Sequence, residues 1–272
     1  MLLRARLSAV VIKTNIFDLS GKVALVTGGG HGFGREYCLA MAEFGAEIAC
    51  ADINKKLADE TVEMIKRFGH RQIAIEADVS KQEHIEAMVN QTVAELGGID
   101  IFFYTPGVAT TPVRLHELTI EEWDRSMAIN LRGVFVCMRA VLPIMLKNRR
   151  GSIILTSSVA GLVAGSEEWG LKNAAPYGAA KAAIICLTRH AAVAYAKDGI
   201  RINAIAPGGH ETWPIGAPHE LVKQVHERMS KFIPMGRMGQ PNEIKGLAIF
   251  LASDASSYIT GQTFVQDGGY TA

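Results

Sequence analysis

The sequence has 272 residues, of which 49% are hydrophobic and 20% are charged. A chain of this composition can bury a large core, which excludes an intrinsically disordered protein. Its formal net charge of +1 provides no general attraction to nucleic acid or to an acidic membrane surface. We therefore expect a globular protein whose partner is a small molecule bound at a local site, with no nucleic acid and no membrane involved.

The four cysteines lie in separate apolar stretches, and their spacing matches neither a metal site nor a disulfide framework: Cys38, Cys50, Cys137 and Cys186. Cysteines in such surroundings usually behave as small buried hydrophobic residues. We expect free thiols in a reducing cytoplasm, and we predict no bound metal.

The first 16 residues carry three basic side chains and no acidic one. Their apolar run is short for a signal peptide, and a small-residue cleavage site is missing. We predict an N-terminal extension at 1–16, followed by a catalytic domain at 17–272. No apolar run approaches the length of about 20 residues that a membrane span requires.

From Lys22 onward, short apolar runs alternate with longer segments in which apolar residues recur at helical spacing. Strands are predicted at 22–26, 47–51, 72–76, 99–103, 152–156, 200–205 and 263–265. Helices are predicted at 35–44, 55–68, 81–96, 120–147, 177–196 and 242–251, with a bend late in the fourth one at Pro143. Continuous hydrophobic strands that alternate with helices predict one α/β domain, a Rossmann-type doubly wound parallel sheet with helices on both faces.

A glycine-rich segment, Thr27 to Gly34, lies directly between the first strand and the first helix. Glycines at this position permit a tight turn and let the backbone approach a pyrophosphate, to which the helix N-terminus offers free N–H groups. A glycine-rich turn alone is weak evidence, but its place after the first strand of an α/β alternation predicts a dinucleotide site.

The glycine spacing is Gly-x-x-x-Gly-x-Gly, and several further segments accompany it: Asp78-Val79, Asn130, Ser157-Ser158, Tyr177 to Lys181, Asn203 to Gly208, and Thr260 to Gln262. Together they resemble the short-chain dehydrogenase/reductase family, in its compact single-domain branch, from about Leu19 to Gly269. The resemblance implies an NAD(P)-dependent oxidoreductase acting on CH–OH groups. It implies cofactor contacts at Gly28, Gly30, His31, Gly32, Phe33, Gly34, Asp52, Ile53, Asp78, Val79, Thr105, Gly107, Tyr177, Lys181, Pro207, Gly208, His210 and Thr212.

Asp52 closes the second strand, where an acidic residue would meet the hydroxyl groups of the adenosine ribose. Its charge would repel a 2′-phosphate, and positions 29–31 and 53 hold no Arg or Lys that could receive one. The sequence therefore favours NAD over NADP. By resemblance, Asp78 and Val79 flank the adenine and Thr212 contacts the carboxamide of the nicotinamide.

Oxidation of an alcohol requires a base for the hydroxyl proton, and a Tyr with its ordinary pKa near 10 is a poor base at neutral pH. Lys181 lies four residues after Tyr177 and so on the same helix face, where its charge is expected to stabilise the phenolate. The pair alone could be a chance match, but the apolar residues around it make an idle buried lysine costly. By resemblance, Ser158 rather than Ser157 binds the substrate oxygen, and Asn130 holds a water for proton relay.

One segment departs from the family. Where the family usually has Asn-Asn-Ala-Gly after the fourth strand, this chain has Tyr104-Thr105-Pro106-Gly107. The amides that brace the end of the sheet are replaced, and Pro106 lacks an N–H donor. Gly107 still allows a close backbone approach.

Three variable segments are expected to form the substrate pocket, 106–116, 162–176 and 209–235, and the last is long enough for a lid. Their polar residues favour a polyol, a sugar or a hydroxy acid: Arg114, His116, Glu167, Glu168, Trp169, His210, Glu211, Trp213 and His219. The alternatives are an NADPH-dependent 3-oxoacyl-type reductase, a sugar-nucleotide epimerase or dehydratase, and a non-catalytic cofactor sensor. The apolar helix at 177–196 fits the homotetramer that is common in the family.

Overall fold

The computed structural model describes residues 15–109, 113–164, 174–212 and 218–272. Seven parallel strands form one sheet in the order β3-β2-β1-β4-β5-β6-β7. Their bounds are β1 Val23–Thr27, β2 Glu47–Asp52, β3 Gln72–Glu76, β4 Ile101–Tyr104, β5 Gly151–Thr156, β6 Ile200–Pro207 and β7 Thr263–Gln266. The seven predicted strands and the doubly wound parallel sheet are thus confirmed.

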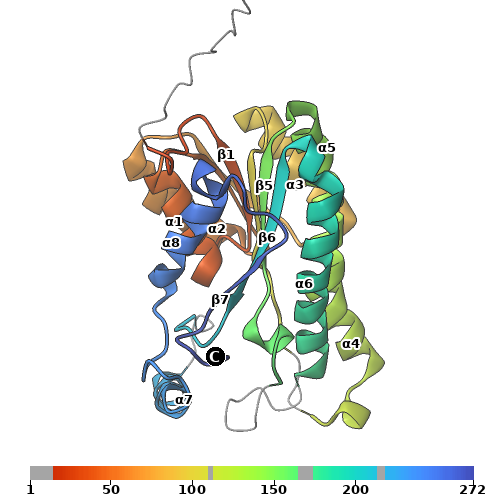
Figure 1. Ribbon diagram of the computed structural model, residues 1–272, viewed down its shortest axis with the longest axis vertical. Coiled ribbons are helices and arrows are strands. Elements are labelled where there is room, and N and C mark those ends of the chain that lie inside the picture. Colours follow the sequence, from red (N-terminus) through yellow and green to blue (C-terminus); the bar gives the residue numbers. More distant parts are fainter. Residues whose placement is uncertain (1–14, 110–112, 165–173, 213–217) are drawn as a thin grey trace, which may run out of the picture.

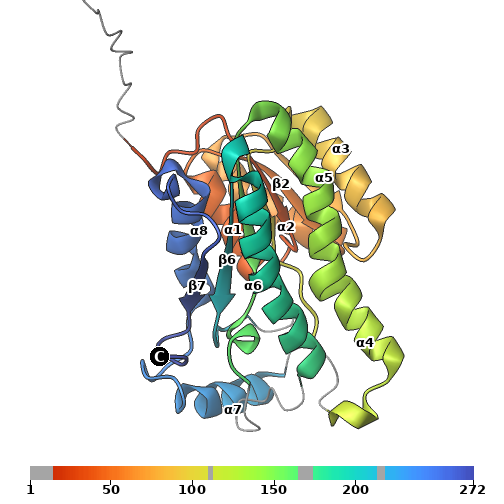
Figure 2. The same cartoon turned by 45° about the vertical axis from the view of Figure 1, so that its right-hand side comes forward.

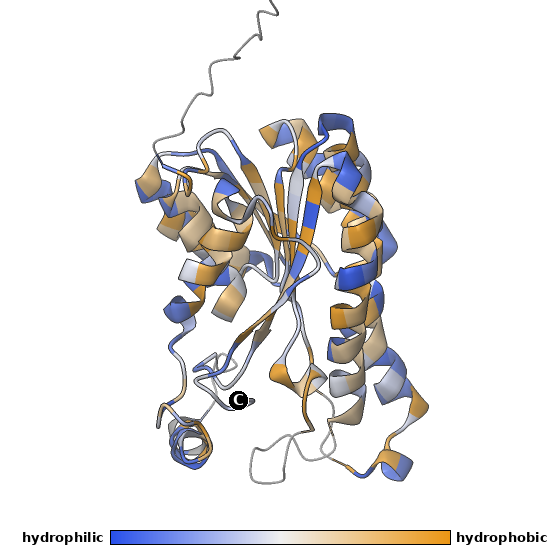
Figure 3. Cartoon of the chain, in the orientation of Figure 1, coloured by the Kyte–Doolittle hydropathy of each residue, from blue (hydrophilic) through white to orange (hydrophobic). Residues whose placement is uncertain are grey.

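Helices cover both faces of the sheet (Figures 1 and 2). One face packs against α1 (Gly32–Glu43), α2 (Lys55–Ile65) and α8 (Lys245–Ala252), and the other against α3 (Gln82–Leu96), α5 (Gly133–Asn148) and α6 (Ala175–Tyr195). Apolar colouring concentrates on the strands and on the inward sides of the helices (Figure 3). Burial on both faces explains why these strands read as continuous apolar runs.

The direction in which the sheet is built reverses between β1 and β4. From β1 the chain adds β2 and β3 on one side, and then returns to add β4 to β7 on the other. In open parallel sheets, this switch point opens a crevice outside the carboxyl ends of the strands, and ligands bind there. The glycine-rich turn that follows β1 lies at this point.

The long helix predicted at 120–147 is present as continuous helix over Ile120–Asn148, although it contains a π-turn that was not predicted. The segment consists of α4 (Ile120–Met127), a π-helix at Ala128–Arg132 and then α5. Pro143, where a bend was expected, lies inside α5. It is exposed, so the hydrogen bond that its ring removes is lost on the solvent side, where water can bind the free carbonyl.

Three smaller expectations also need correction. Cys186 is exposed on α6, whereas the other three cysteines are buried as expected. The predicted lid contains a helix, α7 (His219–Ser230), that hydrophobic periodicity did not reveal. The stretch Ile120–Asn148 is long and apolar enough to cross a membrane by length and composition, although half of its most apolar window is buried inside the protein, as in the core helix of a globular fold.

Candidate active site

The glycine-rich turn joins β1 to α1 in a conformation that requires glycine. Gly28 and Gly32 have φ angles of 68° and 53°, in the left-handed region that disfavours other residues. A Cβ on Gly34 would collide with the Gly28 carbonyl oxygen, so the helix lies directly against the strand. The N-terminus of α1 therefore points its free N–H groups into the crevice, where they suit a pyrophosphate.

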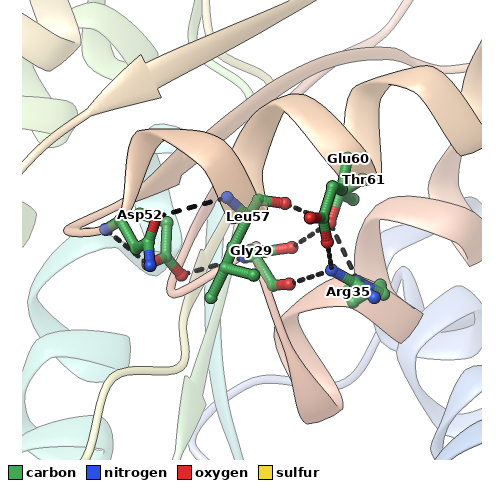
Figure 4. Close-up of polar contacts among 8 residues, drawn as sticks. Gly29, Arg35, Asp52, Leu57, Glu60 and Thr61 are labelled. Atoms are coloured by element: carbon green, nitrogen blue, oxygen red, sulfur yellow. Dashed lines mark hydrogen bonds and ion pairs between the residues drawn. The ribbon is translucent and has the colours of Figure 1, made fainter. Parts of the chain in front are cut away.

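Side chains from α1, β2 and α2 hold this turn in place (Figure 4). The Gly30 N–H donates to Asp52 Oδ2 at 2.9 Å, and the Thr61 hydroxyl donates to the Gly29 carbonyl at 2.9 Å. The Arg35 guanidinium donates to the Gly30 carbonyl and to the Thr61 hydroxyl. Both glycine carbonyls are thus fixed by the protein itself, which leaves the turn ordered for a ligand.

The carboxylate of Asp52 lies beside the turn, at the end of β2. Its Oδ1 accepts the Asn54 N–H at 2.9 Å, and the next residue, Ile53, is 66% exposed. Asp78 and the buried Val79 follow β3, the strand adjacent to β2. Although burial alone would raise the pKa of Asp78, hydrogen bonds from Ser80 hold it below its ordinary value. These four residues therefore lie at or just beyond the carboxyl ends of two adjacent strands, β2 and β3.

Tyr177, Lys181 and Ser158 meet at the carboxyl end of β5. Lys181 Nζ lies 5.4 Å from the centre of the Tyr177 ring and donates to the Thr156 carbonyl at 2.8 Å. Ser158 hydrogen-bonds with the Tyr177 hydroxyl, whereas the Ser157 hydroxyl donates to the Lys181 carbonyl at 2.8 Å. The serine that faces the tyrosine is therefore Ser158, the one predicted from the sequence.

The ionisation of this pair differs from the expectation. Burial raises the pKa of the Tyr177 phenol, and its hydrogen bond with Ser158 offsets part of the rise. Burial also lowers the pKa of the Lys181 ammonium group to about 7. In the protein alone, the desolvation of Tyr177 therefore raises its pKa by more than any stabilisation of phenolate by Lys181 lowers it.

Asn130 lies in the π-helix behind Gly107 and is fully buried. Its side-chain amide donates to the Val108 carbonyl at 2.9 Å, and its Oδ1 accepts the Val108 N–H at 3.0 Å. A Cβ on Gly107 would lie 3.4 Å from Asn130 Oδ1 and 3.6 Å from Lys181 Nζ. The absence of a side chain at Gly107 therefore leaves space into which both the asparagine and the lysine reach.

The segment after β6 closes the crevice from the other side. Pro207 ends β6, and the Gly208 N–H donates to the Gln266 carbonyl at 2.9 Å. The ring of His210 meets that of Phe33 edge-on, with centres 5.0 Å apart, and burial lowers the pKa of this histidine. A Cβ on Gly32 would lie 3.5 Å from Thr212. The glycine-rich turn and this segment thus face each other.

A cavity of about 500 Å³ opens between these elements. Predicted residues that line it are Phe33, Thr105, Gly107, Ser158, Tyr177, Lys181, Pro207, Gly208, His210 and Thr212. Its apolar wall comprises Ala109, Val159, Ala174, Met229 and Met238; Val159 and Met238 lie outside the three segments expected to form the pocket, and none of the five was singled out from the sequence. Met229 lies on α7, within the predicted lid at 209–235, whereas Met238 lies just beyond that segment.

Among the polar residues expected in the pocket whose side chains the structure describes, His210 lines the cavity and the other three do not. Arg114 and His116 are exposed and do not line the cavity, and Glu211 pairs with His226 of α7 at 3.1 Å. Four others, Glu167, Glu168, Trp169 and Trp213, lie outside the described residues, and the side chain of His219 is likewise not described. A second cavity of about 580 Å³ lies at the opposite end of the sheet, among Asp100, Arg150 and Arg201. It contains none of the predicted site residues.

The residues present fit a nicotinamide dinucleotide. The hydroxyl of Thr105 is buried and has no hydrogen-bond partner among the described residues, although it lines the cavity. An unpaired buried hydroxyl is costly unless a ligand or water satisfies it. Together with the free N–H groups of α1 and the acid at the end of β2, it provides polar contacts along the whole crevice.

Known proteins share this architecture. The family model described as enoyl-(acyl carrier protein) reductase matches residues 28–271. The cis-4-hydroxycyclohexanecarboxylate dehydrogenase of Sinomonas cyclohexanicum is 37% identical, over 92% of this chain and 97% of its own. A 3-oxoacyl-[acyl-carrier-protein] reductase of Staphylococcus aureus is 39% identical, over 91% of this chain and 97% of its own.

Among solved structures, an NAD⁺-bound xylitol dehydrogenase aligns with a TM-score of 0.83 and 32% identity, over 92% of this chain and 99% of its own. These matches span nearly the full length of both partners, and they include the glycine-rich turn and the strand order described above. The chain therefore belongs to the short-chain dehydrogenase/reductase family, whose members bind a nicotinamide cofactor, and it is an oxidoreductase acting on secondary alcohols.

Proposed function

We propose that this protein is an NAD-dependent dehydrogenase that interconverts a secondary alcohol on a carbon ring and the corresponding ketone. The observation that carries the proposal is the composition of the cavity. Ser158, Tyr177 and Lys181 line it together with an apolar wall that includes Met229 and Met238. Such a cavity suits a substrate with one reacting hydroxyl group on an apolar skeleton.

Each polar residue has a distinct role in this proposal. Tyr177 takes the hydroxyl proton during oxidation and returns it during reduction, because its own hydroxyl faces the cavity beside Ser158. Ser158 hydrogen-bonds the substrate oxygen, and Lys181 with Asn130 passes the proton on toward solvent. The nicotinamide, when bound, accepts or supplies the hydride and adds positive charge that favours phenolate.

The preference for NAD rests on Asp52. Its carboxylate is fixed by the N–H groups of Gly30 and Asn54 and would stand next to the adenosine ribose. A 2′-phosphate there would meet an immobile negative charge, whereas ribose hydroxyls can donate to it. The nearby guanidinium of Arg35 is already engaged with Gly30, Thr61 and Glu60. We propose that the other residues named by the family resemblance also contact the cofactor.

The substrate class follows from the wall of the cavity and from the ring alcohol that the Sinomonas relative oxidises by its name. An alcohol such as a hydroxycyclohexane derivative offers both an apolar ring and one secondary hydroxyl. A carboxylate or second hydroxyl on the ring would keep it within the polyol and hydroxy-acid range favoured by the sequence. We also propose that 209–235, with α7 tethered through Glu211 and His226, is the lid over this site.

The alternative is an NADPH-dependent 3-oxoacyl reductase, which the Staphylococcus relative favours at 39% identity. Asp52 opposes it, since the charge disfavours the phosphate that distinguishes NADPH. A non-catalytic cofactor sensor would retain the fold without needing Ser158, Tyr177 and Lys181 around one cavity.

We further propose a cytoplasmic homotetramer. The outward sides of α5 and α6 expose large apolar residues, with Phe135 at 56% and Val193 at 81%. Two small residues of α6, Ala182 and Cys186, are also exposed and would let a helix of another subunit approach closely. A monomeric mass in solution would contradict this assembly.

A substrate panel tests the proposed function. We expect NADH formation with cyclohexanol and with cis-4-hydroxycyclohexanecarboxylate, at kcat/KM values at least about tenfold above those of xylitol and sorbitol, because the apolar wall favours a ring. The measurement is the absorbance of reduced cofactor. Turnover of acyclic polyols alone would contradict the ring preference, and NADPH-driven reduction of 3-oxoacyl thioesters alone would favour the alternative.

Tyr177→Phe removes the proton-transferring hydroxyl and retains the ring. We expect kcat to fall by at least about a hundredfold, while NADH binding, followed by protein fluorescence, stays within about twofold of wild type. Tyr195→Phe is the matched control, because that tyrosine lies at the far end of the same helix. A fully active Tyr177→Phe protein would rule out the proposed chemistry.

Asp52→Ser removes the charge beside the ribose site. We expect the ratio of kcat/KM with NAD to kcat/KM with NADP to fall by about tenfold or more, since a repulsion and two hydrogen bonds to ribose are lost. Steady-state kinetics with both cofactors measures it. Asp59→Ser, on the exposed side of α2, should leave the ratio unchanged; an equal effect of both substitutions would contradict the role of Asp52.

Lys181→Met should abolish turnover and yet stabilise the fold at neutral pH. The unfolded lysine keeps its proton up to a pH near 10.5, whereas burial lowers the folded pKa to about 7. This difference in pKa lowers the free energy of unfolding by its full amount below pH 7, and the destabilisation disappears as the pH rises past 10.5. We expect a gain of roughly 2–4 kcal/mol at pH 6.5 and about 1 kcal/mol or less at pH 10 in urea unfolding. A gain that is independent of pH would contradict this account.

A further inference from the structure

The tetrapeptide that departs from the family pattern places an aromatic residue at the carboxyl end of β4. Tyr104 is the last residue of that strand and is completely buried. Its hydroxyl donates a hydrogen bond to the carbonyl of Ile129, which lies 25 residues further along the chain. The acceptor belongs to the π-helix that separates α4 from α5.

The Ile129 carbonyl has lost its usual helical partner. In an α-helix, the Gly133 N–H would donate to the carbonyl four residues back, which is that of Ile129. Here the Gly133 N–H donates to the carbonyl of Ala128, five residues back, as a π-turn requires. The π register thus removes the backbone donor of the Ile129 carbonyl, and the Tyr104 hydroxyl takes its place.

The packing around Tyr104 is specific to this arrangement. A Cβ on Gly133 would collide with the Tyr104 hydroxyl and would lie 2.9 Å from the Val79 carbonyl. Gly133 thus provides the space into which the hydroxyl reaches. Burial raises the pKa of the Tyr104 phenol well above its ordinary value, so the group remains a donor throughout the physiological pH range.

The residue that follows the braced carbonyl is Asn130. Its side chain binds both backbone groups of Val108 and also donates to the Ser126 hydroxyl at 3.0 Å. The π-turn is therefore attached to the segment after β4 at two points, Tyr104 through Ile129 and Val108 through Asn130. Between these points lies Gly107, next to which Asn130 Oδ1 and Lys181 Nζ are found.

We propose that Tyr104 is a positioning residue for the reaction: its hydroxyl holds the π-turn at Ala128–Arg132 in register, and thereby keeps Asn130 aligned with Lys181. The inference rests on the proposed function for the roles of Asn130 and Lys181. Without this hydroxyl, the Ile129 carbonyl lacks a donor in the π register. The turn then regains a hydrogen bond by returning to the α register, in which the Gly133 N–H donates to that carbonyl. That change rotates Asn130 about the helix axis and separates its amide from Val108.

A double-mutant cycle with Tyr104→Phe and Asn130→Ala tests the proposal. Tyr104→Phe alone should lower kcat by about tenfold and leave NADH binding within about twofold of wild type. In the Asn130→Ala background, the same substitution should change kcat by less than about twofold, because a residue that acts through Asn130 has nothing left to position. Tyr195→Phe removes the hydroxyl of a partly buried tyrosine that packs against the same apolar cluster and should change neither quantity.

A second measurement needs no turnover. Hydrogen exchange of a peptide spanning 126–134 should be faster in Tyr104→Phe than in wild type, with peptides from α1 and α2 unchanged. This result would stand even if no alcohol of the panel were oxidised, so a failure of the proposed function is distinguishable from a failure of the inference. Wild-type kcat and exchange in Tyr104→Phe, or effects of the two substitutions that simply multiply, would overturn it.

Discussion

The active site depends on the double attachment of α6 to the end of β5 through Lys181. The ammonium group of this residue donates to the Thr156 carbonyl, and its own carbonyl accepts the Ser157 hydroxyl. A Cβ on Gly161 would lie 2.7 Å from the Lys181 carbonyl carbon, so the turn after β5 also lies directly on the helix. Tyr177, one helical turn earlier, and Ser158, two residues past the strand, are thereby fixed relative to each other.

This attachment places a titratable cation where water is excluded. The resulting desolvation lowers the pKa of Lys181 to about 7, so the group exchanges its proton near neutral pH. That property suits a proton relay better than it suits a permanent charge that stabilises phenolate. In the proposed mechanism, a bound oxidised nicotinamide would supply much of the positive charge that favours the Tyr177 phenolate, and deprotonation of the tyrosine would then be linked to the presence of that cofactor.

Much of the fold could be predicted from the sequence because its strongest signals are local. The strands are buried on both faces and therefore read as uninterrupted apolar runs, and the glycines before α1 mark a turn that only glycine permits at Gly28 and Gly32. Tyr177 and Lys181 share a helix face by spacing alone. Half of the residues that the family resemblance named line one cavity.

The features that could not be predicted are decided by contacts between distant segments. The π-turn before α5 depends on hydrogen bonds from Tyr104 and Val108 to residues more than 20 positions away, and no periodicity encodes them. Pro143 is tolerated because its side of α5 faces solvent. The helix α7 is rich in polar residues, and among its described side chains Met229 and Val225 pack against the apolar cluster of Val159, Ile233 and Met238.

The segment after β4 shows how an unusual sequence can retain the geometry of a site. A Cβ on Gly28 would lie 3.2 Å from Pro106 N and 3.3 Å from its ring, so the proline supports the cofactor turn by contact rather than by hydrogen bonding. On its other side, the segment reaches Asn130 through Val108 and the π-turn through Tyr104. One short stretch therefore touches both the dinucleotide turn and the proton-transfer residues. The amide side chains that the family usually has in this segment can be replaced by the phenol of Tyr104 and the ring of Pro106. The site requires fixed backbone positions there, and close packing supplies these as well as amide hydrogen bonds do.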